Sequence, residues 1–163
     1  MSFWRTYYHL IWATKDQKPL ITPDMESKVT AYLIRKANEL GVRVYAIIVM
    51  PDHVHLIVAI PPRMAVADVV KHLKGFVSFA LGSGFAWQRG YGVMTFGERQ
   101  RQKAIAYVQN QRQLHAQNET NPWLERYDEY DEGPPDHGLQ VDDMIDLLKE
   151  APPIYNTLGE APF

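Results

Sequence analysis

The sequence contains no cysteine among its 163 residues. Disulfide bridges and metal sites built on thiolates are therefore excluded. No apolar run reaches the roughly 18 residues that a membrane-spanning helix needs, and the first residues lack the basic stretch and apolar stretch of a secretory signal. Internal repeats and low-complexity segments are absent from the sequence as well. We therefore expect a cytoplasmic protein.

Charge is distributed unevenly along a chain whose length and 46% hydrophobic content are typical of one globular domain. Residues 1–118 hold 15 Lys and Arg against 7 Asp and Glu, a net charge of +8, whereas residues 119–163 hold 2 against 12, a net charge of −10. A basic body suits binding to a phosphate backbone, although a solvated surface with unrelated counter-charges would have the same balance.

Two histidines flank a single apolar residue in the stretch from Met50 to Val58. Side chains alternate faces along a strand, so His53 and His55 project the same way, about 7 Å apart and within reach of one cation. Val54 then falls on the opposite face, which a strand packed under a helix layer requires. Two histidines in a strand are also often polar side chains on a partly exposed face. The pair therefore needs support from a second segment.

Residues 104–115 provide that support, since their composition favours a helix and includes neither proline nor glycine. Tyr107, Gln111 and His115 are spaced four residues apart and would share one helical face. A tyrosine on such a face is often only an amphipathic core residue, and a glutamine there is often only a polar surface residue. Together with the histidine pair, however, they indicate a site for metal-assisted chemistry by a tyrosine nucleophile.

The hydrophobic periodicities predict an α+β fold. Residues 53–60 follow residues 42–49 after a short turn, which predicts an antiparallel hairpin. Thr22 and Pro23 predict the start of the first helix, and Gly41 its end. The resulting order, β-α-β-β-α-β and then an extra helix, is the ferredoxin-like arrangement of an antiparallel sheet with helices on one face. The predicted strands cover residues 3–13, 42–49, 53–60 and 85–96, and the predicted helices 23–40, 65–81 and 98–117.

Three segments together resemble the single-tyrosine HUH transposases, the small transposases of insertion sequences and their relatives encoded beside repetitive palindromes. Pro-Asp-His-Val-His at 51–55 resembles the family's HUH strand. Trp-Gln-Arg-Gly-Tyr-Gly at 87–92 resembles a segment common before the nucleophile helix, and Tyr-Val-Gln-Asn-Gln at 107–111 resembles that helix itself. Order and spacing agree as well, and the resemblance covers residues 3–118.

The resemblance implies that Tyr107 attacks single-stranded DNA and becomes linked to a 5′ phosphate, leaving a free 3′ hydroxyl. It implies that His53, His55 and Gln111 hold a divalent metal ion, for which we expect Mg²⁺ or Mn²⁺, although histidine ligands favour Mn²⁺, Co²⁺ or Zn²⁺. Exchange of one phosphodiester for another needs no nucleotide cofactor, and the sequence has no glycine-rich phosphate loop followed by Lys and Ser or Thr. The family's DNA carries hairpins, and its homodimers place the histidine pair of one protomer against the tyrosine helix of the other.

Several further residues are candidates for supporting roles. His115 is expected near the metal, as a ligand or as a charge at the negative end of the helix. Asp52 either accepts the second N–H of a histidine or stabilises the turn. Trp87 and Tyr91 are candidates for stacking on DNA bases. Candidates for contacts to the DNA backbone are basic residues of the body: Arg35, Lys36, Lys71, Lys74, Arg99, Arg101 and Lys103.

The chain departs from the family after residue 118. We expect a catalytic domain over residues 1–118 and an acidic extension over 119–163, in which the spacing of apolar residues predicts a short amphipathic helix over 140–149. Our hypothesis is that the acidic extension moderates DNA binding. Its deletion would then change the affinity for DNA and its salt dependence.

Transposition is the function that the sequence favours, and two alternatives stay open. One is an HUH endonuclease that nicks palindromic repeats without mobilising an element. The other is a catalytically idle ferredoxin-like module that binds metal or nucleic acid. The second is hard to reconcile with an intact tyrosine, glutamine and histidine pair.

Overall fold

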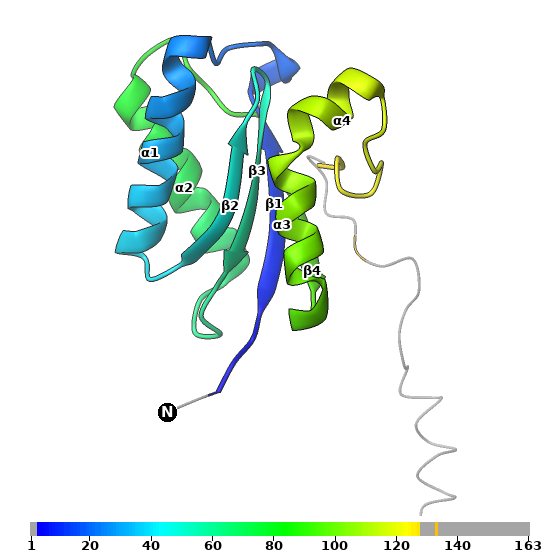
Figure 1. Cartoon of the computed structure of the whole chain (residues 1–163). Coiled ribbons are helices and arrows are strands. Elements are labelled where there is room, and N and C mark those ends of the chain that lie inside the picture. Colours follow the sequence, from blue (N-terminus) through cyan, green and yellow to red (C-terminus); the bar gives the residue numbers. More distant parts are fainter. Residues whose placement is uncertain (1–2, 128–132, 134–163) are drawn as a thin grey trace, which may run out of the picture. The chain divides into compact units, whose positions relative to one another are not determined.

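The structure, a computed structural model, describes residues 3–127 and 133. Within them a four-stranded antiparallel sheet has the order β2-β3-β1-β4. The chain order is β-α-β-β-α-β with helices after it, which confirms the predicted ferredoxin-like fold (Figure 1). The strands are β1 (Tyr7–Ala13), β2 (Arg43–Val49), β3 (His53–Ala59) and β4 (Gly92–Phe96). The helices are α1 (Pro23–Glu39), α2 (Val66–Leu81), α3 (Arg101–Gln109) and α4 (Gln111–Gln117), with short 3-10 helices at Lys15–Gln17 and Glu98–Gln100.

The first helix begins and ends where the sequence predicts. Thr22 is its N-cap residue with an extended backbone, and Pro23 occupies the first helical position, where a missing N–H costs nothing. Gly41 follows the last turn with a φ of +75°, a conformation that glycine adopts without strain. The hairpin between β2 and β3 is also confirmed.

Helices cover both faces of the sheet. Figure 1 shows α1 and α2 packed side by side on one face and α3 lying across the other. The large hydrophobic core lies under α1 and α2 and includes Leu33, Val70 and Leu73 from these helices. Under α3 the apolar contacts are few, and their buried members are Ala46, Ile57 and Val108. The extra helix therefore packs on the sheet face that the first two helices leave uncovered.

Strand β3 contributes to both faces, as the alternation of its side chains predicts. Val54, Leu56 and Val58 are fully buried in the large core. His53 and His55 point to the opposite face, which α3 covers. One short strand thus packs into the large core with one face and places two imidazoles on the other face.

Three predicted elements are wrong in extent. The first strand, predicted over 3–13, begins only at Tyr7. The strand predicted over 85–96 is confined to β4, because Gly90 turns the chain with a φ of +80° and the Lys74 amine binds the carbonyl oxygens of Gln88 and Gly90. Before the turn, Trp87 makes only an isolated bridge to Thr14.

The helix predicted over 98–117 is likewise not continuous. It starts with a 3-10 turn and is interrupted at Asn110, whose ψ of 8° leaves the helical range. Asparagine favours such a break, because its side chain competes for backbone hydrogen bonds. The predicted helix over 140–149 lies outside the described residues. Of the helices that the structure describes, none is long and apolar enough to cross a membrane.

Candidate active site

Three histidines meet on the α3 side of the sheet. His53 and His55 come from β3 and are 7% and 0% exposed, and His115 comes from α4. The ring of His53 lies 5.0 Å from that of His55 and 5.0 Å from that of His115, measured between centroids. The structure thus brings together the predicted histidine pair and the third histidine that the sequence placed near it.

Hydrogen bonds orient the two strand histidines. Asp52 Oδ1 lies 2.7 Å from His53 Nδ1, and His9 Nε2 lies 2.8 Å from His55 Nδ1. When each Nδ1 carries the proton and donates it, each Nε2 is left with a free lone pair. This is the arrangement in which histidines bind metal ions, with an outer acceptor fixing the ring. Asp52 has the contact expected of such an acceptor, and His9 is a second acceptor that the sequence did not predict.

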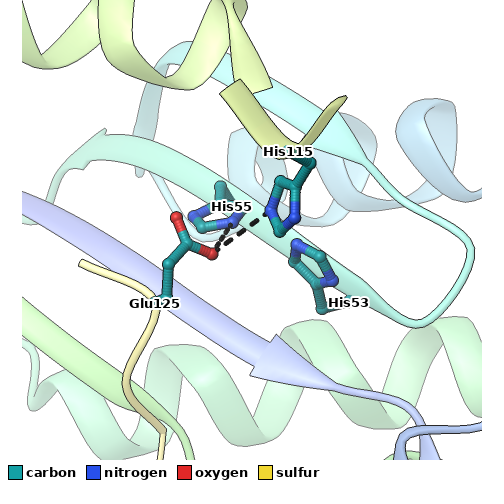
Figure 2. A group of neighbouring side chains, drawn as sticks. All are labelled: His53, His55, His115 and Glu125. Carbon is teal, nitrogen blue, oxygen red and sulfur yellow. Dashed lines mark ion pairs between the residues drawn. The ribbon is translucent and has the colours of Figure 1, made fainter. Parts of the chain in front are cut away.

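The free nitrogens face one another and a carboxylate. The Nε2 atoms of His53, His55 and His115 are buried without a hydrogen-bond partner among the described residues. Glu125 Oε2 lies 3.2 Å from His55 Nε2 and 3.4 Å from His115 Nε2. Dashed lines mark these two ion pairs in Figure 2. All four ligand atoms lie within 4.8 Å of one another. Buried nitrogens that lack donors beside an oxygen fit a divalent cation, so this group can hold a metal ion.

The pKa values of His9, His53 and Glu125 favour the binding of a cation by this group. Burial lowers the pKa of His53, and burial followed by the nearby His55 lowers the pKa of His9 to about 3. Both imidazoles are therefore neutral at neutral pH. Burial alone would raise the pKa of the Glu125 carboxyl, but pairing with His55 and the Tyr107 hydroxyl outweighs it and brings that pKa to about 2. The site therefore offers the neutral imidazole of His53 and the negative charge of Glu125.

Tyr107 lies beside this group in the same chain. Its hydroxyl donates to Glu125 Oε1 at 2.6 Å and accepts from the Asn121 backbone N–H at 2.9 Å. Its ring meets that of His9 edge to face, with centroids 6.2 Å apart. Burial and then the Glu125 carboxylate raise the pKa of the Tyr107 hydroxyl, so the phenol is protonated at neutral pH. A nucleophilic role therefore requires loss of that proton during attack.

Gln111 begins α4 directly after the break at Asn110. It is fully buried, and its side chain lowers the pKa of the neighbouring Tyr107 hydroxyl, but neither amide atom has a partner in hydrogen-bond geometry among the described residues. A buried amide in this condition is costly unless a ligand satisfies it. Because the helix is interrupted, the predicted common helical face of Tyr107, Gln111 and His115 does not exist as one straight stripe.

Several predicted DNA contacts have other partners within the chain. Trp87 packs against Trp12 and Phe85, and its indole N–H donates to the Lys74 carbonyl oxygen. The amine of Lys74 is held by two loop carbonyls, as described above, and burial lowers its pKa to about 8. Tyr91 packs against the large core. Arg35 and Lys36 pair with Glu39, and Arg101 pairs with Glu98, whereas exposed side chains remain at Lys71, Arg99 and Lys103.

Sequence reasoning missed two residues of the site. His9 is placed by the pairing of β1 with β3, where Ile11 lies opposite His55. Its only sequence signal is alternation, which puts Tyr7, His9 and Ile11 on one face. Glu125 comes from the segment after residue 118, where the sequence predicted an acidic extension. Acidic residues are frequent there, so none of them stood out.

Comparison with known proteins places this geometry in a family. Residues 2–111 match the family model described as "Transposase IS200 like". The ISDra2 transposase TnpA of Deinococcus radiodurans is 32% identical over 115 residues, which cover 64% of this chain and 82% of that protein. The transposase of insertion sequence element IS200 from Salmonella typhimurium is 28% identical over 106 residues, covering 58% of this chain and 70% of that protein.

Solved structures agree with the sequence matches. A crystal structure described as a transposase from Deinococcus radiodurans has a TM-score of 0.52 and 31% identity, covering 68% of this chain and 95% of the other. A tyrosine transposase bound to a REP hairpin has a TM-score of 0.56 at 17% identity, covering 76% of each chain, and shows the shared fold. The histidine strand and the tyrosine helix both lie within the matched residues, and the chain belongs to the IS200-like transposase family.

Proposed function

We propose that this transposase cleaves and rejoins single-stranded DNA through a covalent intermediate on Tyr107, with the help of a divalent metal ion. The observation that carries the proposal is that the Tyr107 hydroxyl and the histidine group share one carboxylate, that of Glu125. A nucleophile and a metal site that touch the same side chain lie close enough to act on one phosphodiester.

The exchange balances without any further reactant. The phenolic oxygen of Tyr107 attacks phosphorus and loses its proton, while the bond from phosphorus to the 3′ oxygen breaks and that oxygen is protonated. The products are a 5′-phosphotyrosine and a free 3′ hydroxyl. In the reverse direction a 3′ hydroxyl attacks the phosphotyrosine and releases Tyr107. Cleavage and rejoining are thus one reaction run in two directions.

The metal ion is proposed to be Mg²⁺ or Mn²⁺, held by His53, His55 and the amide oxygen of Gln111. When bound, it would polarise a phosphate oxygen and stabilise the charge that develops on phosphorus. This ligand set is supported by the Nε2 atoms of His53 and His55 and by the buried Gln111 amide, all of which lack a hydrogen-bond partner among the described residues. His53 and His55 position the phosphate relative to Tyr107, because Asp52 and His9 fix their rings.

The test is formation of a covalent adduct between the protein and single-stranded DNA. The protein is incubated with strands from the flanks of its own gene and Mn²⁺ or Mg²⁺, and the products are separated on a denaturing gel. We expect an adduct with the wild type and with Tyr32→Phe, a tyrosine of α1 on the opposite side of the sheet, but none with Tyr107→Phe or His53→Ala. An adduct that survives Tyr107→Phe would refute the proposed nucleophile.

We further propose that the DNA partner carries a hairpin, since a protein of this fold has been solved with a REP hairpin. Strands with an intact palindrome are compared with strands in which one arm is scrambled. Preferential binding of the intact palindrome is expected. Equal affinity for both strands would show that the hairpin is not recognised.

A homodimer with shared active sites is a separate proposal. Within one chain, Tyr107 already lies next to its own histidine group, so a shared site requires exchange of α3 and α4 between protomers. Mixing Tyr107→Phe with His53→Ala tests this. Exchange would restore an adduct in the mixture, on the His53→Ala chain alone, whereas sites complete within each chain would leave the mixture inactive.

A further inference from the structure

Glu125 lies outside the residues that match the family model, yet it contacts both halves of the site. One carboxylate oxygen faces the nitrogens of His55 and His115, and the other accepts a hydrogen bond from the Tyr107 hydroxyl. The side chain is only 18% exposed, so the charge is largely withdrawn from water. A carboxylate so largely withdrawn from water is costly unless a cation compensates its charge.

The segment that carries Glu125 is anchored on the same structure. Asn121 donates its backbone N–H to the Tyr107 hydroxyl, and its carbonyl oxygen accepts from the N–H groups of Leu124 and Glu125. The carbonyl of Arg126 lies against Gly92 of β4, where any β-carbon would collide with it. Residues 121–126 therefore form a strap, held on the nucleophile at one end and on the edge strand at the other.

We propose that Glu125 is a ligand of the metal ion together with His53, His55 and His115, and that it is the ligand which the scissile phosphate displaces. The second part of this inference rests on the function proposed above. Before DNA binds, His115 and Glu125 take the place of the Gln111 amide as ligands, and both lie outside the residues that match the family.

Donor chemistry supports the first part. Three imidazole nitrogens and one carboxylate oxygen, all within 4.8 Å of one another, are four ligands of the kinds that Zn²⁺ and Co²⁺ take. Mg²⁺ prefers six oxygen ligands and several waters, which this nitrogen-rich group does not match. Binding of the cation would also neutralise the buried carboxylate and satisfy the three unpartnered nitrogens. With Glu125 bound, the resting site would therefore select Zn²⁺ or Co²⁺ over Mg²⁺.

The geometry of the carboxylate supports the second part. A phosphodiester in position for attack must present one oxygen to the cation and its phosphorus to the Tyr107 hydroxyl. The Glu125 carboxylate already lies between the histidines and the Tyr107 hydroxyl, with one oxygen towards the histidines and the other accepting a hydrogen bond from the hydroxyl. Two anions cannot occupy one place, and a site with four protein ligands leaves no open position for substrate. Glu125 must therefore leave when DNA enters.

The first experiment measures Co²⁺ binding to the full chain without DNA, by titration and by the visible absorption of the bound ion. Four-coordinate Co²⁺ absorbs more strongly than six-coordinate Co²⁺. Glu125→Gln keeps the shape of the side chain and removes its charge, and Glu119→Gln at an exposed glutamate is the matched control. We expect Glu125→Gln to weaken binding at least about tenfold, the low end of the losses seen even for outer-shell substitutions, and to change the spectrum.

His115→Ala provides a second variant, at a side chain that is 35% exposed and contributes little to the core. It should weaken Co²⁺ binding as well. If Glu125→Gln and His115→Ala both bind Co²⁺ with the affinity and spectrum of Glu119→Gln, the proposed ligands are wrong. Circular dichroism of each variant verifies that it is folded, so a loss of binding cannot come from unfolding.

The second experiment tests displacement. Single-stranded DNA is added to the Co²⁺-loaded protein, with Tyr107→Phe present to block cleavage. We expect the spectrum to change as phosphate replaces the carboxylate, and we expect Glu125→Gln in the same background to bind the DNA more tightly because a competing anion is gone. Unchanged spectrum and unchanged affinity would overturn displacement. A failure of the covalent-adduct test would instead refute the proposed function and leave the Co²⁺ result standing.

Discussion

The two faces of the sheet differ in what they bury. Under α1 and α2 the sheet buries aliphatic and aromatic side chains almost exclusively, and under α3 it buries three histidines and a glutamine beside a few apolar contacts. Strand β3 belongs to both, because its side chains alternate between them. The first face supplies the hydrophobic burial that stabilises the fold, and this lets the second face hold polar groups without partners.

This division explains why buried polar atoms can persist here. The unpartnered atoms of His53, His55 and Gln111 each carry a desolvation cost of about 1–3 kcal/mol when no ligand satisfies them. A domain can tolerate such costs only if burial elsewhere exceeds them, since net stability is about 5–15 kcal/mol. The comparison therefore predicts that substitutions on the two faces have separable effects, on metal binding and on stability.

The largest effect is expected from His55→Ala. The substitution removes one of the imidazole nitrogens that would bind the metal ion, so metal binding should be lost. Titration with Co²⁺ or Mn²⁺ measures this, with His72→Ala at an exposed residue of α2 as the control. Retention of wild-type affinity by His55→Ala would show that the ion binds elsewhere.

Leu56→Ala tests the opposite face at the neighbouring position. Leu56 is fully buried in the large core, and its truncation should lower the free energy of unfolding by about 2–5 kcal/mol. Urea unfolding of the metal-free protein gives this value. The affinity of the folded fraction for metal should stay near that of the wild type. A parallel loss of metal affinity would mean that the two faces of the sheet are energetically coupled.

Asp52→Asn should have a smaller effect on the same site. The substitution keeps the size of the side chain but weakens the acceptor that orients His53 Nδ1. Outer-shell changes of this kind typically lower metal affinity about 10–100-fold. Competition with a chelator measures the change. A stability loss without any loss of metal affinity would assign Asp52 to the turn alone.

Sequence patterns predicted the parts of this molecule that depend on neighbouring residues. Alternation in β3 placed His53 and His55 on one face and Val54 on the other, and the boundaries of α1 followed from Thr22 and Gly41. These features are local, because strand and helix periodicity and capping act over a few residues.

The parts that depend on tertiary contact could not be predicted in this way. The break at Asn110 has no proline or glycine to mark it, and it lets Gln111 enter the interior. His9 reaches His55 through strand pairing over 46 positions, and Glu125 reaches it over a still longer separation. No periodicity connects residues so far apart, so a single sequence holds no signal for their meeting.

The smallest effect is expected from single exposed basic residues, which differ between the two faces of the sheet. Lys103 is exposed on α3, one turn before Tyr107, whereas Lys71 is exposed on α2 beyond the other face. If DNA approaches the site on the α3 side, Lys103→Ala should weaken DNA binding by a similar factor for all sequences. It should also reduce the slope of log affinity against log salt concentration by about 1. Lys71→Ala should leave the slope unchanged. The measurement is the DNA affinity of each variant at several salt concentrations. A larger loss for Lys71→Ala than for Lys103→Ala would place the DNA on the α2 side of the sheet, away from Tyr107.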